Sequence, residues 1–123
     1  MIYFLRKHNG ELSPASSGTY IDVYGETRHL MQHEMRVQVL NTWKSPNSNA
    51  EYPARWRLII PPLSMDLTVV PRMADQEMKT PESTNVTYWE GSVSVSGTRN
   101  RKPIKGQGYA ELTGYSNPLN APM

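Results

Sequence analysis

The sequence predicts an all-β fold, a closed or incompletely closed antiparallel β-barrel. Residues 88–97 and 106–115 each alternate in side-chain character, which indicates a β-hairpin. Ten prolines and eight glycines divide the rest of the chain into strand-sized pieces. Helical periodicity is almost absent: residues 35–40 alternate apolar and polar instead. The pieces amount to roughly eight short, evenly spaced strands, which is typical of a barrel or a sandwich.

The first half of the chain divides at its turn signals. His8-Asn9-Gly10 ends the first strand, Gly25 ends the second, and the polar stretch 45–49 closes the fourth. The expected strands are residues 2–7, 20–24, 28–31 and 35–43.

The second half begins with a strand at 54–60, which places Trp56, Leu58 and Ile60 on one face. Pro61-Pro62 ends it, and a further strand is expected at 63–70. Residues 71–84 are polar and expected to be irregular. The C-terminal hairpin then occupies 86–115, with a loop near 98–103.

The hairpin has one apolar face, formed by Trp89, Gly91, Val93 and Val95, which should point toward a core. Two registers are open. In one, Tyr109 covers the bare backbone of Gly91. In the other, Glu90 lies beside Glu111, where the like charges repel unless one is protonated or paired. The sequence does not choose between them.

Composition restricts the class of protein. A chain of 123 residues forms one domain with a core that needs no metal or disulfide. The absence of cysteine excludes a disulfide scaffold, a thiol nucleophile and a thiolate metal site. A net charge of +2 argues against a nucleic-acid partner. The basic residues at 99–105 are interpreted as a solvated hairpin loop rather than a phosphate-binding patch. No apolar run is long enough for a transmembrane segment.

The hairpin segments also indicate a family. Tyr88-Trp89-Glu90-Gly91, residues 93–97 and residues 106–115 resemble the C-terminal signature of the secreted AttH-like/CrtC-like hydrolase and hydratase family, which includes carotenoid hydratase and kievitone hydratase. Trp43-Lys44-Ser45-Pro46, Tyr52-Pro53, Trp56, Ile60-Pro61 and Asp75-Gln76-Glu77 are similar to the family pattern in the same order.

The resemblance implies a lipocalin-like domain at residues 1–115, the second of two tandem domains in the family, followed by a disordered tail at 116–123. It also implies an N-terminal lipocalin-like domain as partner and a periplasmic or secreted location. No signal peptide is recognised in residues 1–5, so the chain is either cytoplasmic or exported by a signal upstream. The Asp-His-Glu-Trp-type segment of the family's first half has no counterpart here.

Three acidic residues in the matching motifs, Glu77, Glu90 and Glu111, are candidate catalytic groups. Two carboxylates in an apolar barrel could act as general acid and base in adding water to an alkene. The alternative is structural, with each carboxylate paired to an arginine (Arg55, Arg57 or Arg72) or to a tyrosine hydroxyl.

Aromatic residues are the candidate ligand contacts: Trp43, Trp56, Trp89, Tyr109 and Tyr115, with Tyr52 as a further residue of the same cavity. They could line a cavity for a long apolar ligand, or they could be ordinary core packing. His29 and His33 have a spacing that suits a metal only on a helix, and this region is expected to be strand and turn. No metal or other cofactor is expected.

The leading hypothesis is therefore an accessory domain of an exported protein that binds a hydrophobic small molecule, a lipid or an isoprenoid. One alternative is part of a hydratase or hydrolase whose catalytic residues lie largely outside this chain. The other is a structural module that packs against a partner barrel.

Overall fold

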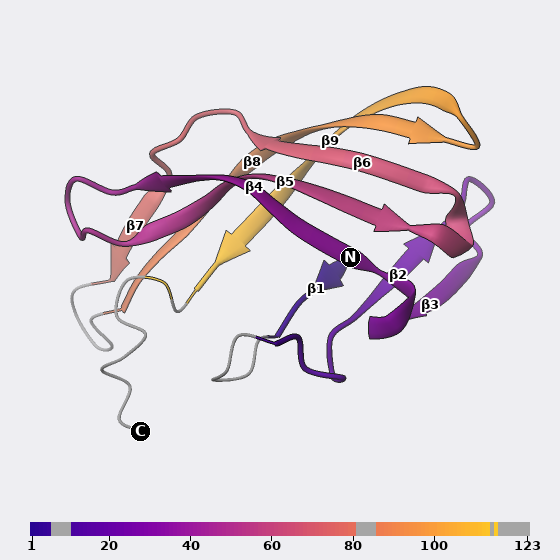
Figure 1. Cartoon of the computed structure of the whole chain (residues 1–123), viewed down its shortest axis with the longest axis horizontal. Helices are drawn as coiled ribbons and strands as arrows, with labels where there is room; N and C mark the ends of the chain where they lie inside the picture. Colours follow the sequence, from indigo (N-terminus) through magenta and orange to yellow (C-terminus); the bar gives the residue numbers. More distant parts are fainter. Residues whose placement is uncertain (6–10, 81–85, 114, 116–123) are drawn as a thin grey trace.

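The computed structural model describes residues 1–5, 11–80, 86–113 and 115. These form nine strands in two antiparallel sheets (Figure 1). The small sheet has the order β1 (Ile2–Tyr3), β2 (Ser17–Ile21), β3 (Thr27–Met31). The large sheet contains β4 (Arg36–Lys44), β5 (Glu51–Ile60), β6 (Met65–Pro71), β7 (Glu77–Thr80), β8 (Val86–Arg99) and β9 (Lys102–Leu112). Two 3-10 turns, η1 (Gln32–Glu34) and η2 (Pro61–Leu63), complete the described elements.

Strand β8 organises the large sheet. One of its edges pairs with β7 at residues 86–89 and with β6 at residues 93–99, while the other pairs with β9. Beyond β6 come β5 and then β4, so β4 and β9 are the outer strands. Within the described residues nothing joins these two strands, and the sheet does not close into a barrel. The all-β antiparallel prediction is confirmed, in its incompletely closed form.

The buried apolar side chains form two clusters. In Figure 1 the large sheet forms the upper layer and the small sheet lies beneath its right-hand part. One core cluster contains Leu30, Met35 and Ile60, and joins the small sheet to β5. The other contains Tyr52, Trp89 and Val93, and belongs to the large sheet alone. The predicted inward face of the hairpin, with Trp89 and Val93, is confirmed.

The hairpin adopts the second of the two registers. Glu90 lies opposite Glu111, and Gly91 lies opposite Ala110 rather than beneath Tyr109. The loop expected near 98–103 is only a two-residue turn, Asn100 and Arg101, both with positive φ (53° and 67°). Such turns match the right-handed twist of the flanking strands.

Other boundaries differ from the prediction. The region 71–84, expected to be irregular, contains β7, which exists because it pairs with β8 and not because of an apolar pattern of its own. The first strand is limited to Ile2–Tyr3, and the second begins earlier, at Ser17. The turn at 8–10 and the tail at 116–123 lie outside the described residues. No helix among the described residues has the length and apolarity to cross a membrane.

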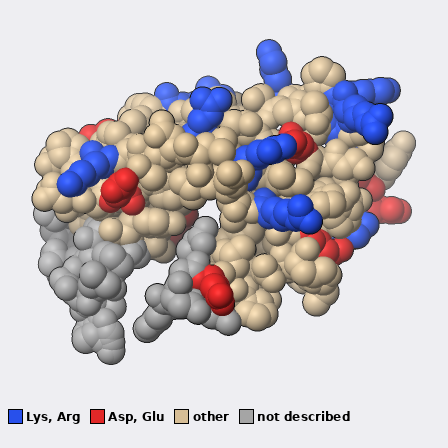
Figure 2. Space-filling model, viewed as in Figure 1, with Lys and Arg blue, Asp and Glu red and all other residues tan. Residues whose placement is uncertain are grey.

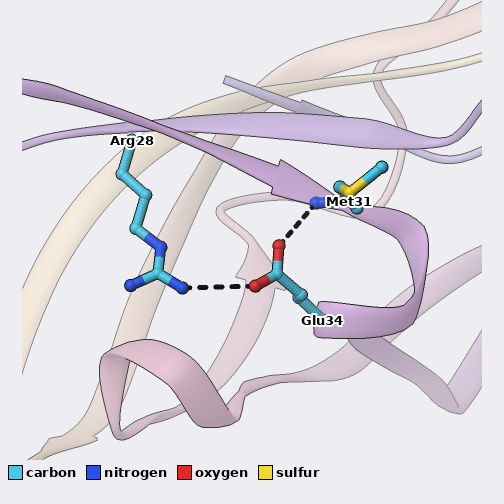
Figure 3. Close-up of polar contacts among 3 residues, drawn as sticks. All are labelled: Arg28, Met31 and Glu34. Atoms are coloured by element: carbon cyan, nitrogen blue, oxygen red, sulfur yellow. Dashed lines mark hydrogen bonds and ion pairs between the residues drawn. The ribbon is translucent and has the colours of Figure 1, made fainter.

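Glu34 fixes the passage from the small sheet to the large one (Figure 3). Its Oε1 accepts the Met31 backbone N–H at 2.9 Å, and its Oε2 pairs with Arg28 Nη2 at 3.2 Å. The Met31 bond first, and then Arg28, hold the pKa of Glu34 below its usual value. The carboxylate therefore ties η1 back to β3, just before β4 begins.

Candidate functional site

A hollow of about 1060 Å³ lies between the inner face of the large sheet and the N-terminal segment. Its walls are mainly apolar. The large sheet contributes Val37, Trp56, Leu58, Leu67, Val69 and Val95, and the small-sheet side contributes Ile2, Phe4, Tyr20 and Leu30. This is the size and lining typical of a site for a small apolar ligand.

One side of the hollow is the edge strand β9, from Gln107 to Leu112. The residues of β9 that pair with Val95 and Val93 on the inner face are Gly106 and Gly108. A Cβ built at Gly106 meets nothing within 4 Å, and one built at Gly108 makes only ordinary contact with Val93 at 3.5 Å. Of the two glycines, Gly108 borders the hollow, and the absence of a side chain there leaves space that a ligand can use.

The predicted aromatic contacts fall into two groups. Trp56, Tyr109 and Tyr115 border the hollow. Trp43 and Trp89 do not: Trp43 stacks on Tyr52 with ring centroids 6.2 Å apart, and the buried Trp89 donates its indole N–H to the Ala74 carbonyl at 2.8 Å. Tyr109 is 69% exposed, so most of its ring faces solvent. Trp56 and Tyr115 are the better placed for an apolar ligand.

Glu77 lies at the centre of a hydroxyl cluster. Its Oε1 accepts the Ser45 hydroxyl at 2.6 Å, and its Oε2 accepts the hydroxyls of Ser48 and of Tyr52, the latter at 2.7 Å. Ser45 and Tyr52 are almost fully buried. The carboxylate thereby fixes the β4–β5 turn, residues 45–50, to β7. This matches the structural alternative, a tyrosine hydroxyl as partner.

The position of Tyr52 in this cluster shifts the pKa of its phenol. Burial, and then the hydrogen bond and charge of Glu77, raise the pKa of its phenol above the usual value, because both disfavour the phenolate. A smaller hollow of about 440 Å³ adjoins the cluster and is lined by Asn47, Ser48, Glu77, Met78 and Thr87. Ser45 and Ser48 were not predicted, and Tyr52 was expected as a cavity residue rather than as a partner of Glu77, since their convergence on Glu77 depends on contacts 25 to 32 residues apart.

Glu90 and Glu111 form a cross-strand pair on the face opposite Trp89. The Tyr88 hydroxyl donates to Glu90 at 3.3 Å. Partial burial, followed by the charge of Glu90, raises the pKa of both Tyr88 and Tyr109. Glu77 pairs with Trp89 and so projects to the other face. The structure thus brings two of the three candidate carboxylates together and separates the third. Their catalytic role stays a prediction.

Gln76 fills the gap between β6 and β7. Its amide accepts the Ser92 N–H at 3.2 Å and donates to the carbonyls of Met73 and Ser92. A Cβ on Gly91 would overlap this amide, so glycine is required for the contact. The motif residues 75–77, 45–46 and 88–91 therefore meet at one end of the sheet, where they hold β4–β5, β7 and β8 together. Among the described residues no group of three or more His, Asp or Glu side chains could hold a metal ion.

Comparisons with known proteins agree with this architecture. The AttH-like family model matches residues 1–115. The structure of a protein from Nitrosomonas europaea, described as an AttH, is 30% identical with a TM-score of 0.77, over 91% of this chain and 33% of that one. Kievitone hydratase from Nectria haematococca has the same fold at 23% identity and a TM-score of 0.71, over 94% of this chain and 34% of the hydratase. The chain thus spans about a third of either protein. No curated protein matches the sequence significantly.

Proposed function

The chain belongs to the AttH-like family, and from this premise we propose that it is a hydratase-related domain that binds an apolar small molecule. The ligand is a lipid or an isoprenoid, and it occupies the hollow between the large sheet and the N-terminal segment. The proposal includes an accessory role within a longer exported protein. The fraction of each structural relative that the chain spans, about a third, supports that role.

The observation that carries the proposal is the hollow itself. Its volume of about 1060 Å³ is slightly above the range of about 300–1,000 Å³ usual for small-molecule sites. Apolar residues from both sheets line it, and Gly108 adds no side chain to its β9 side. Burying apolar ligand surface against such walls is worth about 25 cal/mol per Å² before the costs of association.

The test is to fill the hollow from β9. Gly108→Leu should place a side chain on the inner face and weaken binding of farnesol or a medium-chain alcohol at least tenfold. Lys105→Leu is the matched control, because Lys105 pairs with Ser96 on the outer face of the same strand. Calorimetric titration of both variants and the parent measures the effect. A parent that binds none of a panel of fatty acids, fatty alcohols and isoprenoids would contradict the proposal, as would equal binding by both variants.

A second function, part of a hydratase, is favoured by one observation: Glu90 and Glu111 lie opposite each other on the outer face of β8 and β9, beside the edge strand that borders the hollow. Such a pair could provide an acid and a base at the edge of an apolar site. If so, the chain should hydrate an isoprenoid alkene, and Glu90→Gln and Glu111→Gln should each remove that activity without lowering the melting temperature. Activity that survives both changes would exclude the pair.

A further inference from the structure

Three turns meet at one end of the molecule, on the right in Figure 1. They are the β2–β3 turn (residues 22–26), η2 with Ser64, and the β8–β9 turn. The Asn100 N–H donates to the Ser64 carbonyl at 2.9 Å, which joins the second turn to the third. The Arg99 guanidinium lies 5.3 Å from the centre of the Tyr20 ring, which joins the third to β2. The two hairpin ends are therefore held beside each other.

The β2–β3 turn presents apolar side chains to solvent. Val23 is 90% exposed, Tyr24 is 87% exposed and the preceding Ile21 is 61% exposed. The conformation of the turn is fixed by Asp22, whose Oδ1 accepts the backbone N–H groups of Tyr24 and Glu26, each at 2.9 Å. The turn closes at Gly25, whose φ of +85° favours glycine. The turn and the end of β2 thus expose three large apolar side chains within four residues.

The neighbouring β8–β9 turn is basic. Arg101 and Lys102 are exposed, Lys105 follows on β9, and Arg99 is half-buried. Figure 2 shows lysine and arginine side chains gathered at this end of the molecule. The acidic residues of the two turns are Asp22, which holds the apolar turn, and Glu26; Asp66, opposite Thr98, is paired with Arg57. The two turns together carry more positive than negative charge.

We propose that this end docks on a lipid bilayer that contains anionic headgroups. Val23, Tyr24 and Ile21 would enter the interfacial region, while Arg101 and Lys102 contact lipid phosphates beside them. An apolar tip flanked by cations is the pattern that binds anionic membrane surfaces. A projecting tip suits a bilayer better than a protein pocket, since the apolar and basic groups stand on separate turns. Tyr20 of the same hairpin lines the hollow, so docking would bring the hollow to a source of apolar molecules.

The experiment is sedimentation with vesicles and no added ligand, so its result does not depend on ligand binding. Vesicles of equal parts phosphatidylcholine and phosphatidylglycerol are compared with phosphatidylcholine alone. The first variant, Val23→Ser with Tyr24→Ser, should bind the mixed vesicles about tenfold more weakly. The second, Arg101→Asn with Lys102→Gln, should lose about fivefold for each cation.

The matched controls are Met73→Ser and Arg55→Gln, which alter an exposed apolar and an exposed basic residue away from the three turns. Circular dichroism checks that every variant is folded. Three results together would support the proposal: both turn variants lose binding to the mixed vesicles, both controls keep it, and added salt weakens it. No binding by the parent would overturn it and favour an acidic protein as the partner of this end. Equal binding by turn variants and controls would also overturn it.

Discussion

Removing the Tyr52 hydroxyl tests the cluster around Glu77. Tyr52→Phe keeps the ring in place between Trp43 and Tyr115, with centroid distances of 6.2 Å and 5.7 Å, and removes only the 2.7 Å hydrogen bond to Glu77. A hydrogen bond to a charged group contributes about 1.5–3 kcal/mol. Ser45 and Ser48 still donate to the carboxylate, so it is not left without donors. We therefore expect a loss of about 2 kcal/mol.

Urea unfolding followed by circular dichroism measures this loss, and thermal unfolding should show a melting temperature lower by about 8 °C for a domain of this size. Tyr24→Phe is the control, because Tyr24 is 87% exposed and its change should cost less than about 0.5 kcal/mol. A double-mutant cycle with Glu77→Gln then isolates the pair, with an expected coupling of about 1–2 kcal/mol. The reasoning would be refuted if Tyr52→Phe lowered the free energy of unfolding no more than the control does. It would also be refuted if the effects of Tyr52→Phe and Glu77→Gln were additive in the double mutant.

Three further predictions concern stability. Gly97→Ala should lower the free energy of unfolding in urea by about 3 kcal/mol, because the φ of Gly97 is +155° and its new Cβ would overlap a β6 carbonyl oxygen. Gly106→Ala is the control: its Cβ would lie in open space, so the change should be neutral or slightly stabilising. Gln76→Ala should cost about 1–3 kcal/mol, since it leaves the Ser92 backbone N–H without its acceptor; an unchanged melting temperature would contradict this. Because the pKa of Tyr52 is raised in the folded protein, its neutral phenol contributes fully to stability up to about pH 10. Above about pH 10 the unfolded chain loses this proton while the folded protein keeps it, so stability falls by about 1.4 kcal/mol per pH unit. Alkaline titration of stability should therefore be flatter for Tyr52→Phe than for the parent.

The sequence predicted the fold class because sheet patterns are local. Alternation along 88–97 placed Trp89 and Val93 on the buried face, and the structure confirms it. Register and closure are not local properties. The choice of Glu90 opposite Glu111 follows from the two-residue turn at Asn100 and Arg101, whose positive φ values no alternation pattern shows.

The hidden strand β7 and the Glu77 cluster have the same explanation. Residues 77–80 lack an apolar period, and they form a strand because β8 offers an edge there. The sequence singled out Glu77 and included a tyrosine hydroxyl among its possible partners. Which tyrosine, and the addition of Ser45 and Ser48, depend on the packing of the β4–β5 turn against β7. Long-range packing of this kind cannot be obtained from local patterns.

The most direct test of the central claim, that the hollow receives an apolar ligand, is an NMR titration of the isotope-labelled chain with farnesol. The two informative signals are the indole N–H groups of Trp56, which borders the hollow, and Trp89, which is buried against Ala74. Saturable shifts at Trp56 with little change at Trp89 are the predicted result. No shift at Trp56 up to saturating ligand, or equal shifts at both indoles, would contradict the claim.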